Sequence, residues 1–478
     1  MNVEEMNFSR RVALQTVGTG FGYLAFSGLS AMASPSYRNP LSSKSPHFKP
    51  RAKRVIFACM RGGPSHVDTF DHKPALAKDN GKTLKQFGKR TLLQSPWKFQ
   101  RHGQSGLPIS GLYPQLSKHA DKLCLINGMY ADVPNHPQCF VQLHTGSFQF
   151  VRPSIGAWTL YGLGTENENL PGFVTINPPS RVGGAQNYGN AFLPAIYQGS
   201  RIGSLGQSLN DALIPHLKNN RLNPHQQRKQ LDFIQSMNRD FKEGKQEGSQ
   251  IEGVIESYEL AFRMQSALPE VMNLKREKPA TLESYGIGKV ITDQFGRQCL
   301  MARRLVEKGV RFVEITHGNW DQHGALQKKL TDNCRATDQP LAALLHDLDK
   351  RNLLEDTLVI WGGEFGRTSY CQGALTRENY GRDHHPRAFT TWMAGGGIKP
   401  GITYGQSDDY GYNLTDRDGN VIKPNKHHWT QDTMHVHDLN ATILHLLGID
   451  HRKLTYRYQG RDFRLTDIHG HVIKDILA

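Results

Sequence analysis

The chain has 478 residues, with 58 Lys+Arg against 43 Asp+Glu, a formal net charge of +15 and 37% hydrophobic residues. A mean hydropathy of −0.54 excludes a protein with many membrane spans, and the share of apolar residues excludes a disordered chain. The length is ample for a full hydrophobic core. The positive charge favours anionic partners. The sequence contains no block of five consecutive Lys/Arg and no zinc-finger or RNA-binding motif, so specific nucleic-acid binding is not expected.

Residues 1–33 have the pattern of an export signal. Arg10 and Arg11 precede an apolar stretch over 12–29, and the small-x-small pattern of a cleavage site follows at 31–33. This arrangement is typical of a twin-arginine signal, although an uncleaved anchor or an N-terminal helix would share part of it. The stretch contains Thr and Gly and is a poor membrane span. We therefore expect a periplasmic or secreted protein with a linker over 34–53 and no transmembrane span after signal removal.

The six cysteines are scattered and show no CxxC spacing. A cysteine-rich zinc site is therefore not expected, and disulfide partners cannot be assigned from the sequence. Several cysteines lie in apolar runs, where the thiol behaves as a small buried hydrophobe.

Short apolar runs alternate with helical patterns over most of the chain. The runs span 54–60, 122–126, 173–176, 310–316, 357–361 and 389–393. The helical patterns cover 295–306, 341–348 and 438–447. This alternation predicts an α/β domain over 54–478, with a mainly parallel central sheet and helices on both of its faces. The long polar segment at about 203–283 has helical periodicity and predicts a helical insertion.

The loops that follow these runs are dense in chemically active side chains. Carboxyl ends of parallel strands gather at one sheet edge, where sites form. Carboxylates and imidazoles from several strand ends are typical of a divalent-metal hydrolase. The candidate metal ligands are His66, Asp68, Asp321, His323, Glu364, Asp383 and His384. The candidates for contact with a substrate oxyanion are Arg61, Ser65, Arg367 and Arg382. Each motif alone also fits a surface turn or a helix cap, so the prediction depends on their joint placement.

Several segments, in chain order, resemble the bacterial family known as domain of unknown function 1501. They include GGPSHVDTFD at 62–71, NHPQCFVQLHTG at 135–146, WDQHG at 320–324, GGEFGRT at 362–368, GRDHHP at 381–386 and HDLNATILHLLGID at 437–450. The resemblance covers nearly all of the mature chain and implies an alkaline-phosphatase/sulfatase-like fold. It also implies departures from that superfamily. Arg61 falls near the position of the first-strand Asp, Asp132 at that of the nucleophilic Thr, and Glu364-Phe365-Gly366 replaces DHG. No C-x-P-S-R sulfatase segment surrounds any cysteine.

Together these observations predict a secreted, metal-dependent hydrolase of phosphate or sulfate esters. Asp132 is the candidate nucleophile or metal ligand, and His136 is the candidate general base or water-orienting group. The cofactor is a divalent metal, either zinc, manganese, iron or calcium. The expected partner is an anionic small molecule or polysaccharide. The alternative is a catalytically degenerate binding or structural protein on the same fold, because an altered nucleophile position is what loss of activity would produce.

Overall fold

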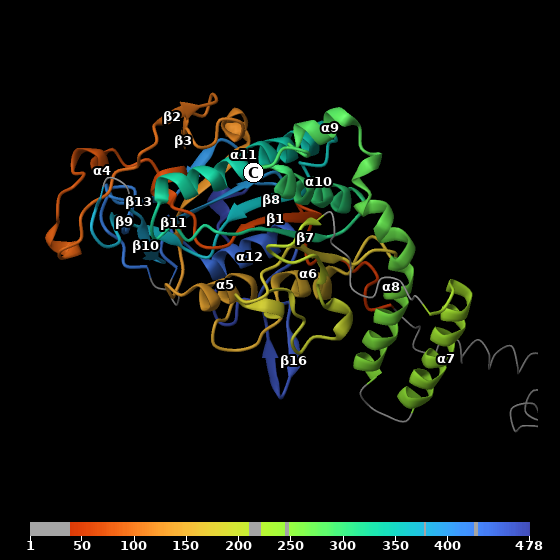
Figure 1. The fold of residues 1–478 in the computed structure, drawn as a ribbon. Coiled ribbons are helices and arrows are strands. Elements are labelled where there is room, and N and C mark those ends of the chain that lie inside the picture. The colour runs from red at the N-terminus through yellow and green to blue at the C-terminus, as the bar shows by residue number, and fades with distance from the viewer. Residues whose placement is uncertain (1–38, 210–220, 244–247, 377–378, 425–428) are drawn as a thin grey trace, which may run out of the picture. The chain divides into compact units, whose positions relative to one another are not determined.

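Nine strands form the central sheet of the computed structural model, which describes residues 39–209, 221–243, 248–376, 379–424 and 429–478 (Figure 1). All elements below belong to the unit that spans residues 40–478. The predicted export signal at 1–33 lies outside the described residues. None of the described helices is long and apolar enough to cross a membrane.

The strand order is β12-β4-β11-β8-β1-β7-β5-β6, and β15 also pairs with β4. The bounds are β1 Arg54–Met60, β4 Leu123–Tyr130, β5 Phe173–Ile176, β6 Ser200–Ile202, β7 Phe312–His317, β8 Thr357–Gly362, β11 Phe389–Ala394, β12 Ile402–Tyr404 and β15 Met434–His435. Within these described strands, β11 is antiparallel to both of its neighbours, and every other pair is parallel. The structure therefore confirms the predicted mainly parallel sheet.

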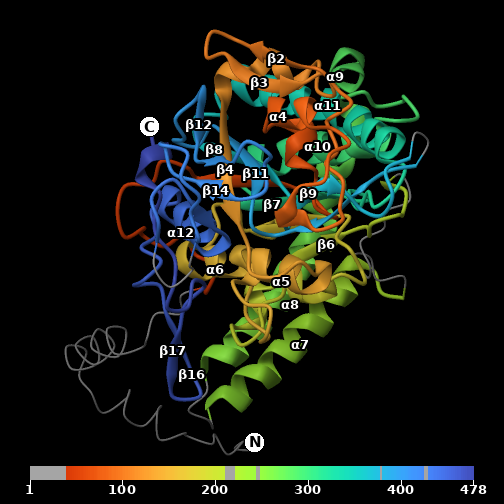
Figure 2. The same cartoon turned by 90° about the vertical axis from the view of Figure 1, so that its left-hand side faces the viewer.

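Helices cover both faces of this sheet, as the alternating pattern predicts (Figure 1). On one face lie α10 Asp293–Glu307 and α11 Leu326–Lys350, and on the other lie α5 His136–Thr145, α6 Ile155–Leu163 and α12 Val436–Leu446. Between β6 and α10 the chain forms α7 Pro224–Glu243, α8 Gly248–Met272 and α9 Pro279–Ser284. Helices α7 and α8 lie side by side in both views (Figure 2).

Shorter elements decorate the sheet. They are α3 His66–Thr69, α4 Pro74–Lys78, β2 Phe99–His102, β3 Leu107–Ser110, η2 Leu116–Lys122, β9 Gly366–Cys371, β10 Arg382–His385, β13 Gln406–Ser407, β14 Leu414–Thr415, β16 Tyr456–Tyr458 and β17 Arg461–Phe463. The pair β9 and β10 forms an antiparallel ribbon of its own, outside the central sheet.

The central strands are buried because helices pack on both of their faces. Every residue of β8 is buried, as are all but the first residue of β1. Strand β1 lies between β7 and β8, with Met60 beside His317 and Cys59 beside Gly362. The loops that leave β1, β7 and β8 therefore start at one level of the same sheet edge. This edge holds most of the candidate site residues.

Candidate metal centre

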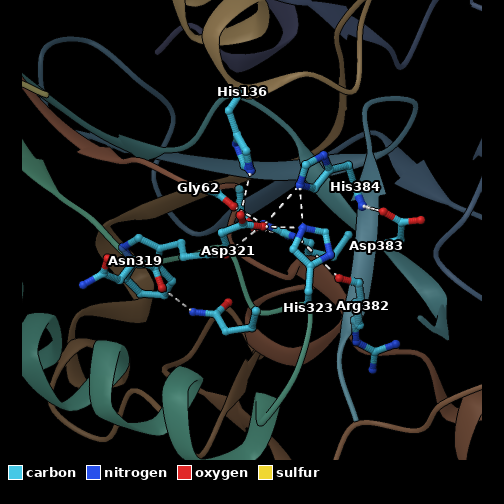
Figure 3. A network of polar contacts seen from close by, with 12 residues as sticks. Gly62, His136, Asn319, Asp321, His323, Arg382, Asp383 and His384 are labelled. Atoms are coloured by element: carbon cyan, nitrogen blue, oxygen red, sulfur yellow. Dashed lines mark hydrogen bonds and ion pairs between the residues drawn. The ribbon is translucent and has the colours of Figure 1, made fainter. Parts of the chain in front are cut away.

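Four side chains from three parts of the chain converge at this edge (Figure 3). The Asp321 carboxylate lies 2.8 Å from His323 Nε2, 3.2 Å from His384 Nε2 and 3.3 Å from His136 Nε2. The Nε2 atoms of His323 and His384 lie 2.9 Å apart. Three of the four residues, His136, Asp321 and His384, form a group with one ligand atom each within 4.8 Å of one another. We call these four residues the His3Asp cluster.

The hydrogen bonds on the far side of each ring fix its tautomer. Each imidazole of the cluster turns its Nδ1 to an oxygen that can only accept a hydrogen bond. These oxygens are Glu364 Oε1 at 2.6 Å from His136, Pro134 O at 2.8 Å from His384, and the side-chain Oε1 of Gln372 beside His323. The proton of each neutral ring therefore resides on Nδ1. The three Nε2 lone pairs and a carboxylate then face one another, an arrangement that a cation would satisfy.

Local structure places these groups for clear reasons. His136 opens α5, with the Asn135 side chain capping the helix and a proline in its first turn. Asp321 and His323 lie between β7 and α11, directly after the carboxyl end of β7. His384 lies in β10, opposite Arg367 of β9, rather than in a loop as the sequence predicts. The antiparallel ribbon thus brings its histidine to the edge of the main sheet.

Arg367 supports the carboxylate at the centre of the cluster. Its guanidinium donates to Asp321 Oδ1 at 2.6 Å and also to the backbone oxygens of Gly62 and Gly63. Burial would raise the pKa of Asp321. Without a cation, hydrogen bonds from the His136 and His384 rings, each carrying an added proton on Nε2, and from Arg367 lower that pKa far below its usual value. Asp321 therefore stays ionised. Arg367 is itself buried and committed to these oxygens, so it is not available to a substrate oxyanion.

Glu364 holds His136 rather than standing in the cluster. Its fully buried carboxylate accepts from the backbone N–H of Gly62 at 2.9 Å and from His136 Nδ1. A carboxylate behind a ligating imidazole fixes the ring orientation and raises its basicity. Gly62 has φ +121°, and a Cβ there would lie 2.8 Å from the backbone nitrogens of Asp321 and Trp320. Only glycine allows this close approach of the two loops.

Two predicted ligands after β1 are engaged elsewhere. The Asp68 carboxylate forms a buried pair with Arg382, at 2.7 and 3.0 Å, and accepts from Ser65 Oγ at 2.6 Å. His66 Nε2 bonds to the carbonyl of Gly411 at 2.7 Å, and burial lowers the pKa of this imidazole. Neither His66 nor Asp68 belongs to a potential metal-binding group among the described residues. The structure therefore does not bring them, Ser65 or Arg382 to the cluster.

Three further predicted residues lie around the cluster in different ways. Asp383 lies outside it, with its carboxylate accepting from the backbone N–H of His384 at 2.8 Å (Figure 3). Asp132 contacts the Gln142 amide at 2.5 Å and His435 Nε2 at 3.3 Å. Arg61 directly follows the last residue of β1 and begins the turn that leaves this strand. Its buried Nε has no hydrogen-bond partner, and its guanidinium forms no ion pair with the described residues.

The donor set fits a divalent transition metal. Two ligand atoms about 2.0–2.1 Å from a zinc ion stand about 3.3 Å apart in a tetrahedron. Four pairs of potential ligand atoms in the cluster are separated by 2.8 to 3.3 Å, close to that edge length. Three imidazoles with one carboxylate suit zinc, iron or manganese better than calcium, which prefers six or more oxygen ligands.

The sequence analysis missed Gln372 and the Pro134 carbonyl, which accept hydrogen bonds from His323 and His384, because neither group has a metal-ligand signature.

Residues 52–477 match the family described as Protein of unknown function (DUF1501). The chain belongs to this family. The match spans nearly all of the described residues and confirms the resemblance carried by the segments at 62–71 and 381–386. No curated protein sequence matches this DUF1501 protein.

Several solved structures are similar to this chain at low identity. The PsFucS1 sulfatase from Pseudoalteromonas sp. is 13% identical with a TM-score of 0.37, covering 96% of this chain and 75% of its own. The lipoteichoic acid synthase LtaP from Listeria monocytogenes is 8% identical with a TM-score of 0.36. The alignment covers 90% of this chain and 79% of the LtaP chain. Ps i-CgsB, in complex with k-i-k-neocarrahexaose, is 11% identical with a TM-score of 0.34. The alignment covers 83% of this chain and 72% of the Ps i-CgsB chain. Similarities at this level assign no activity to the DUF1501 chain.

Proposed function

We propose that this protein is a metal-dependent hydrolase of phosphate or sulfate esters. One observation carries the proposal. In the His3Asp cluster, hydrogen bonds donated by the Nδ1 atoms leave three imidazole lone pairs directed at one carboxylate. Such convergence of acceptors requires a cation or added protons. The side chains of Asp321 and His323 are each about one-third exposed, so a bound ion would be open to a ligand from solvent.

A divalent ion at this place supplies Lewis-acid chemistry, polarising an ester oxygen and lowering the pKa of water. The chain's own residues do the rest. His136, His323 and His384 with Asp321 hold the ion, and Glu364 keeps the His136 ring in its binding orientation. Arg367 keeps Asp321 ionised.

Arg61 is the group we assign to the substrate oxyanion. Arg61 follows the carboxyl end of β1 and precedes Gly62, which lies against the loop that contains Asp321. Unlike Arg367 and Arg382, it forms no ion pair with any described residue. A free guanidinium offers paired N–H donors that match two oxygens of phosphate or sulfate. The net charge of +15 favours a polyanionic substrate such as a sulfated polysaccharide.

The attacking oxygen in this proposal comes from water. The Asp132 carboxylate is held by the Gln142 amide and lies beside His435 Nε2. Ser65 Oγ is buried and donates to Asp68. These commitments also favour the second candidate, a metal-binding protein without turnover, because a committed nucleophile position is what a degenerate enzyme would show.

The test is turnover of aryl sulfate and aryl phosphate monoesters by protein stripped with a chelator and then resupplied with zinc, manganese or iron. We expect hydrolysis only after metal return. Arg61→Met should bind metal as before and lose at least about tenfold in kcat/KM, equivalent to about 1.4 kcal/mol. The matched control is Arg101→Met, an exposed arginine on β2. Full metal occupancy without turnover on any ester would instead support the binding protein.

Export by the twin-arginine route remains part of the proposal. Arg10→Lys with Arg11→Lys should leave the precursor in the cytoplasm, because the receptor reads the guanidinium pair as an address. Cell fractionation in a host with only that route measures this. Periplasmic accumulation of the double variant would overturn it.

A further inference from the structure

A second group of potential ligands lies inside the protein, between the central sheet and α5. It consists of Cys59 on β1, Glu314 on β7 and His144 on α5. One ligand atom from each lies within 4.8 Å of the others, and all three side chains are at most 1% exposed. We call this group the CysHisGlu cluster.

Neighbouring groups fix the tautomer of His144. Its Nδ1 donates to the carbonyl of Phe140 at 2.7 Å, so the neutral ring keeps its proton on that atom. Its Nε2 lone pair then faces Glu314 Oε2 at 3.1 Å. The ring lies between Phe57 and Phe140, with ring centroids at 6.0 and 4.5 Å, so the imidazole is surrounded by apolar groups.

The polar atoms of this cluster lack hydrogen bonds within the described part of the chain. His144 Nε2 and both Glu314 oxygens have no partner of hydrogen-bond geometry, although Nε2 and Oε2 are in contact. The buried hydroxyls of Thr175 and Thr316 also lack partners. Thr175 is in register with Glu314, and Thr316 is in register with Cys59, so these hydroxyls lie on the adjoining strands. Buried polar atoms left unpaired cost about 1–3 kcal/mol each, so a cluster of them calls for a ligand.

We propose that the CysHisGlu cluster binds a transition-metal ion, zinc being the best match, as a closed structural site distinct from the His3Asp cluster. In a tetrahedral zinc site the N–O edge is about 3.3 Å and the S–N edge about 3.6 Å. The observed 3.1 Å contact without hydrogen-bond geometry matches such an edge. A thiolate, a carboxylate and a neutral imidazole balance the charge of a divalent ion, which removes the penalty of a net charge in the core.

Complete burial favours a structural rather than a catalytic role, because none of the three ligand side chains is more than 1% exposed to solvent. The ion would therefore be taken up as the chain folds, and its binding free energy would add to the stability of the folded state. The competing arrangement fills the centre with protons: a His144 imidazolium beside a Glu314 carboxylate, with Cys59 as a thiol. The two arrangements differ in metal content and in the state of one sulfur atom.

The test begins with the full chain refolded in the presence of cobalt(II). Coordination of a thiolate to cobalt gives a charge-transfer absorption in the near ultraviolet that oxygen and nitrogen ligands do not give. We expect this absorption in the wild type and its loss in Cys59→Ser. Cys124→Ser, a change at another buried cysteine outside both clusters, should keep it. In zinc, Cys59→Ser should hold about one ion fewer per chain than Cys124→Ser by elemental analysis.

Asp321→Ala separates this inference from the proposed function. That variant should lose the ion of the His3Asp cluster but keep the cobalt–thiolate absorption. Absence of the absorption in folded wild-type protein that holds cobalt would overturn the inference, even if no cysteine variant folds. Equal metal content in Cys59→Ser and Cys124→Ser would also overturn it.

Discussion

The buried pair of Arg382 and Asp68 shows how one partner decides the role of a residue. Both side chains are fully buried and meet through two hydrogen bonds of 2.7 and 3.0 Å. Because Arg382 lies 314 positions away, the sequence around Asp68 could not reveal that its charge is already balanced. The motif therefore predicted a metal ligand where the structure places a structural ion pair.

Asp68→Asn should destabilise the protein without changing its metal content. Removing one member of a buried pair leaves the other charge uncompensated, at a cost of about 3–5 kcal/mol. Urea unfolding measures this loss, and elemental analysis measures the metal. The exposed pair Lys328–Asp332 provides the control, and Asp332→Asn should change stability little. Loss of bound metal in Asp68→Asn would restore Asp68 as a ligand.

The same scale explains which site residues the sequence could predict. Asp321, His323 and His384 follow or flank strand runs, and the structure brings their side chains together. His136 is predicted as a general base or a water-orienting group, because its motif shows the residue type and not the direction of its two nitrogens. Glu314 was missed, although a carboxylate inside the apolar run at 310–316 was a usable signal of a buried polar cluster.

At the scale of elements, α5 connects the two clusters, because it carries both His136 and His144. It ends at Gly146, which has φ +69° and lies against Leu465, where an added Cβ would be 2.3 Å from the backbone oxygen. Gly146→Ala should therefore lose at least about 2 kcal/mol, from left-handed backbone strain plus displacement of that backbone.

The matched control for this change is Gly184→Ala. Gly184 also has a positive φ, of +54°, but no atom of the described residues lies within 4 Å of an added Cβ. It should lose only the conformational part, about 1 kcal/mol. Denaturant unfolding of both variants makes the comparison. Equal losses would show that the contact of Gly146 with Leu465 does not constrain the end of α5.

Helix α11 contains a carboxyl group that makes stability depend on pH. Asp338 accepts from the backbone N–H groups of Gln115 and Leu116, at 2.8 to 3.1 Å, and ties α11 to η2. Burial raises the pKa of Asp338 to about 6, against hydrogen bonds from Leu116 and Gln115 that lower it. The folded state therefore binds a proton more tightly than the unfolded state does. This contribution to stability is complete below about pH 4 and is lost as pH rises through about 6.

Asp338→Asn should remove this pH dependence. The free energy of unfolding of the wild type, minus that of the variant, should fall by about 2–3 kcal/mol between pH 4 and pH 7. Urea titrations at several pH values give this difference and cancel the contributions of other groups. A difference that stays constant with pH, or one that grows as pH rises, would contradict the assignment.

Sequence patterns fixed some elements more sharply than others. The predicted runs at 54–60 and 173–176 coincide with β1 and β5, because continuous apolar residues there end abruptly at polar or glycine residues. The antiparallel direction of β11 was not predictable, since strand direction depends on which distant strands become its neighbours. The segment that forms β10 was likewise predicted as a loop. Its four residues alone do not indicate that they pair with β9.

At the scale of the whole molecule, metal binding should be visible as added stability. An ion that binds only the folded state stabilises it by about 2.7 kcal/mol at a concentration one hundred times its Kd. We expect protein stripped by chelator to melt at a higher temperature when zinc or manganese returns, and to respond less to calcium. Asp321→Ala should show a smaller rise than the wild type. An equal rise in both would place the responsive ion outside the His3Asp cluster.

We propose that His136, Asp321, His323 and His384 bind one divalent ion together. Metal-edge anomalous diffraction from crystals grown with zinc tests it most directly. We expect an anomalous peak bounded by the three Nε2 atoms and the Asp321 carboxylate, at about 2.0–2.2 Å from each ligand atom. A crystal grown with zinc, with ordered side chains and no peak at that place, would contradict this metal site.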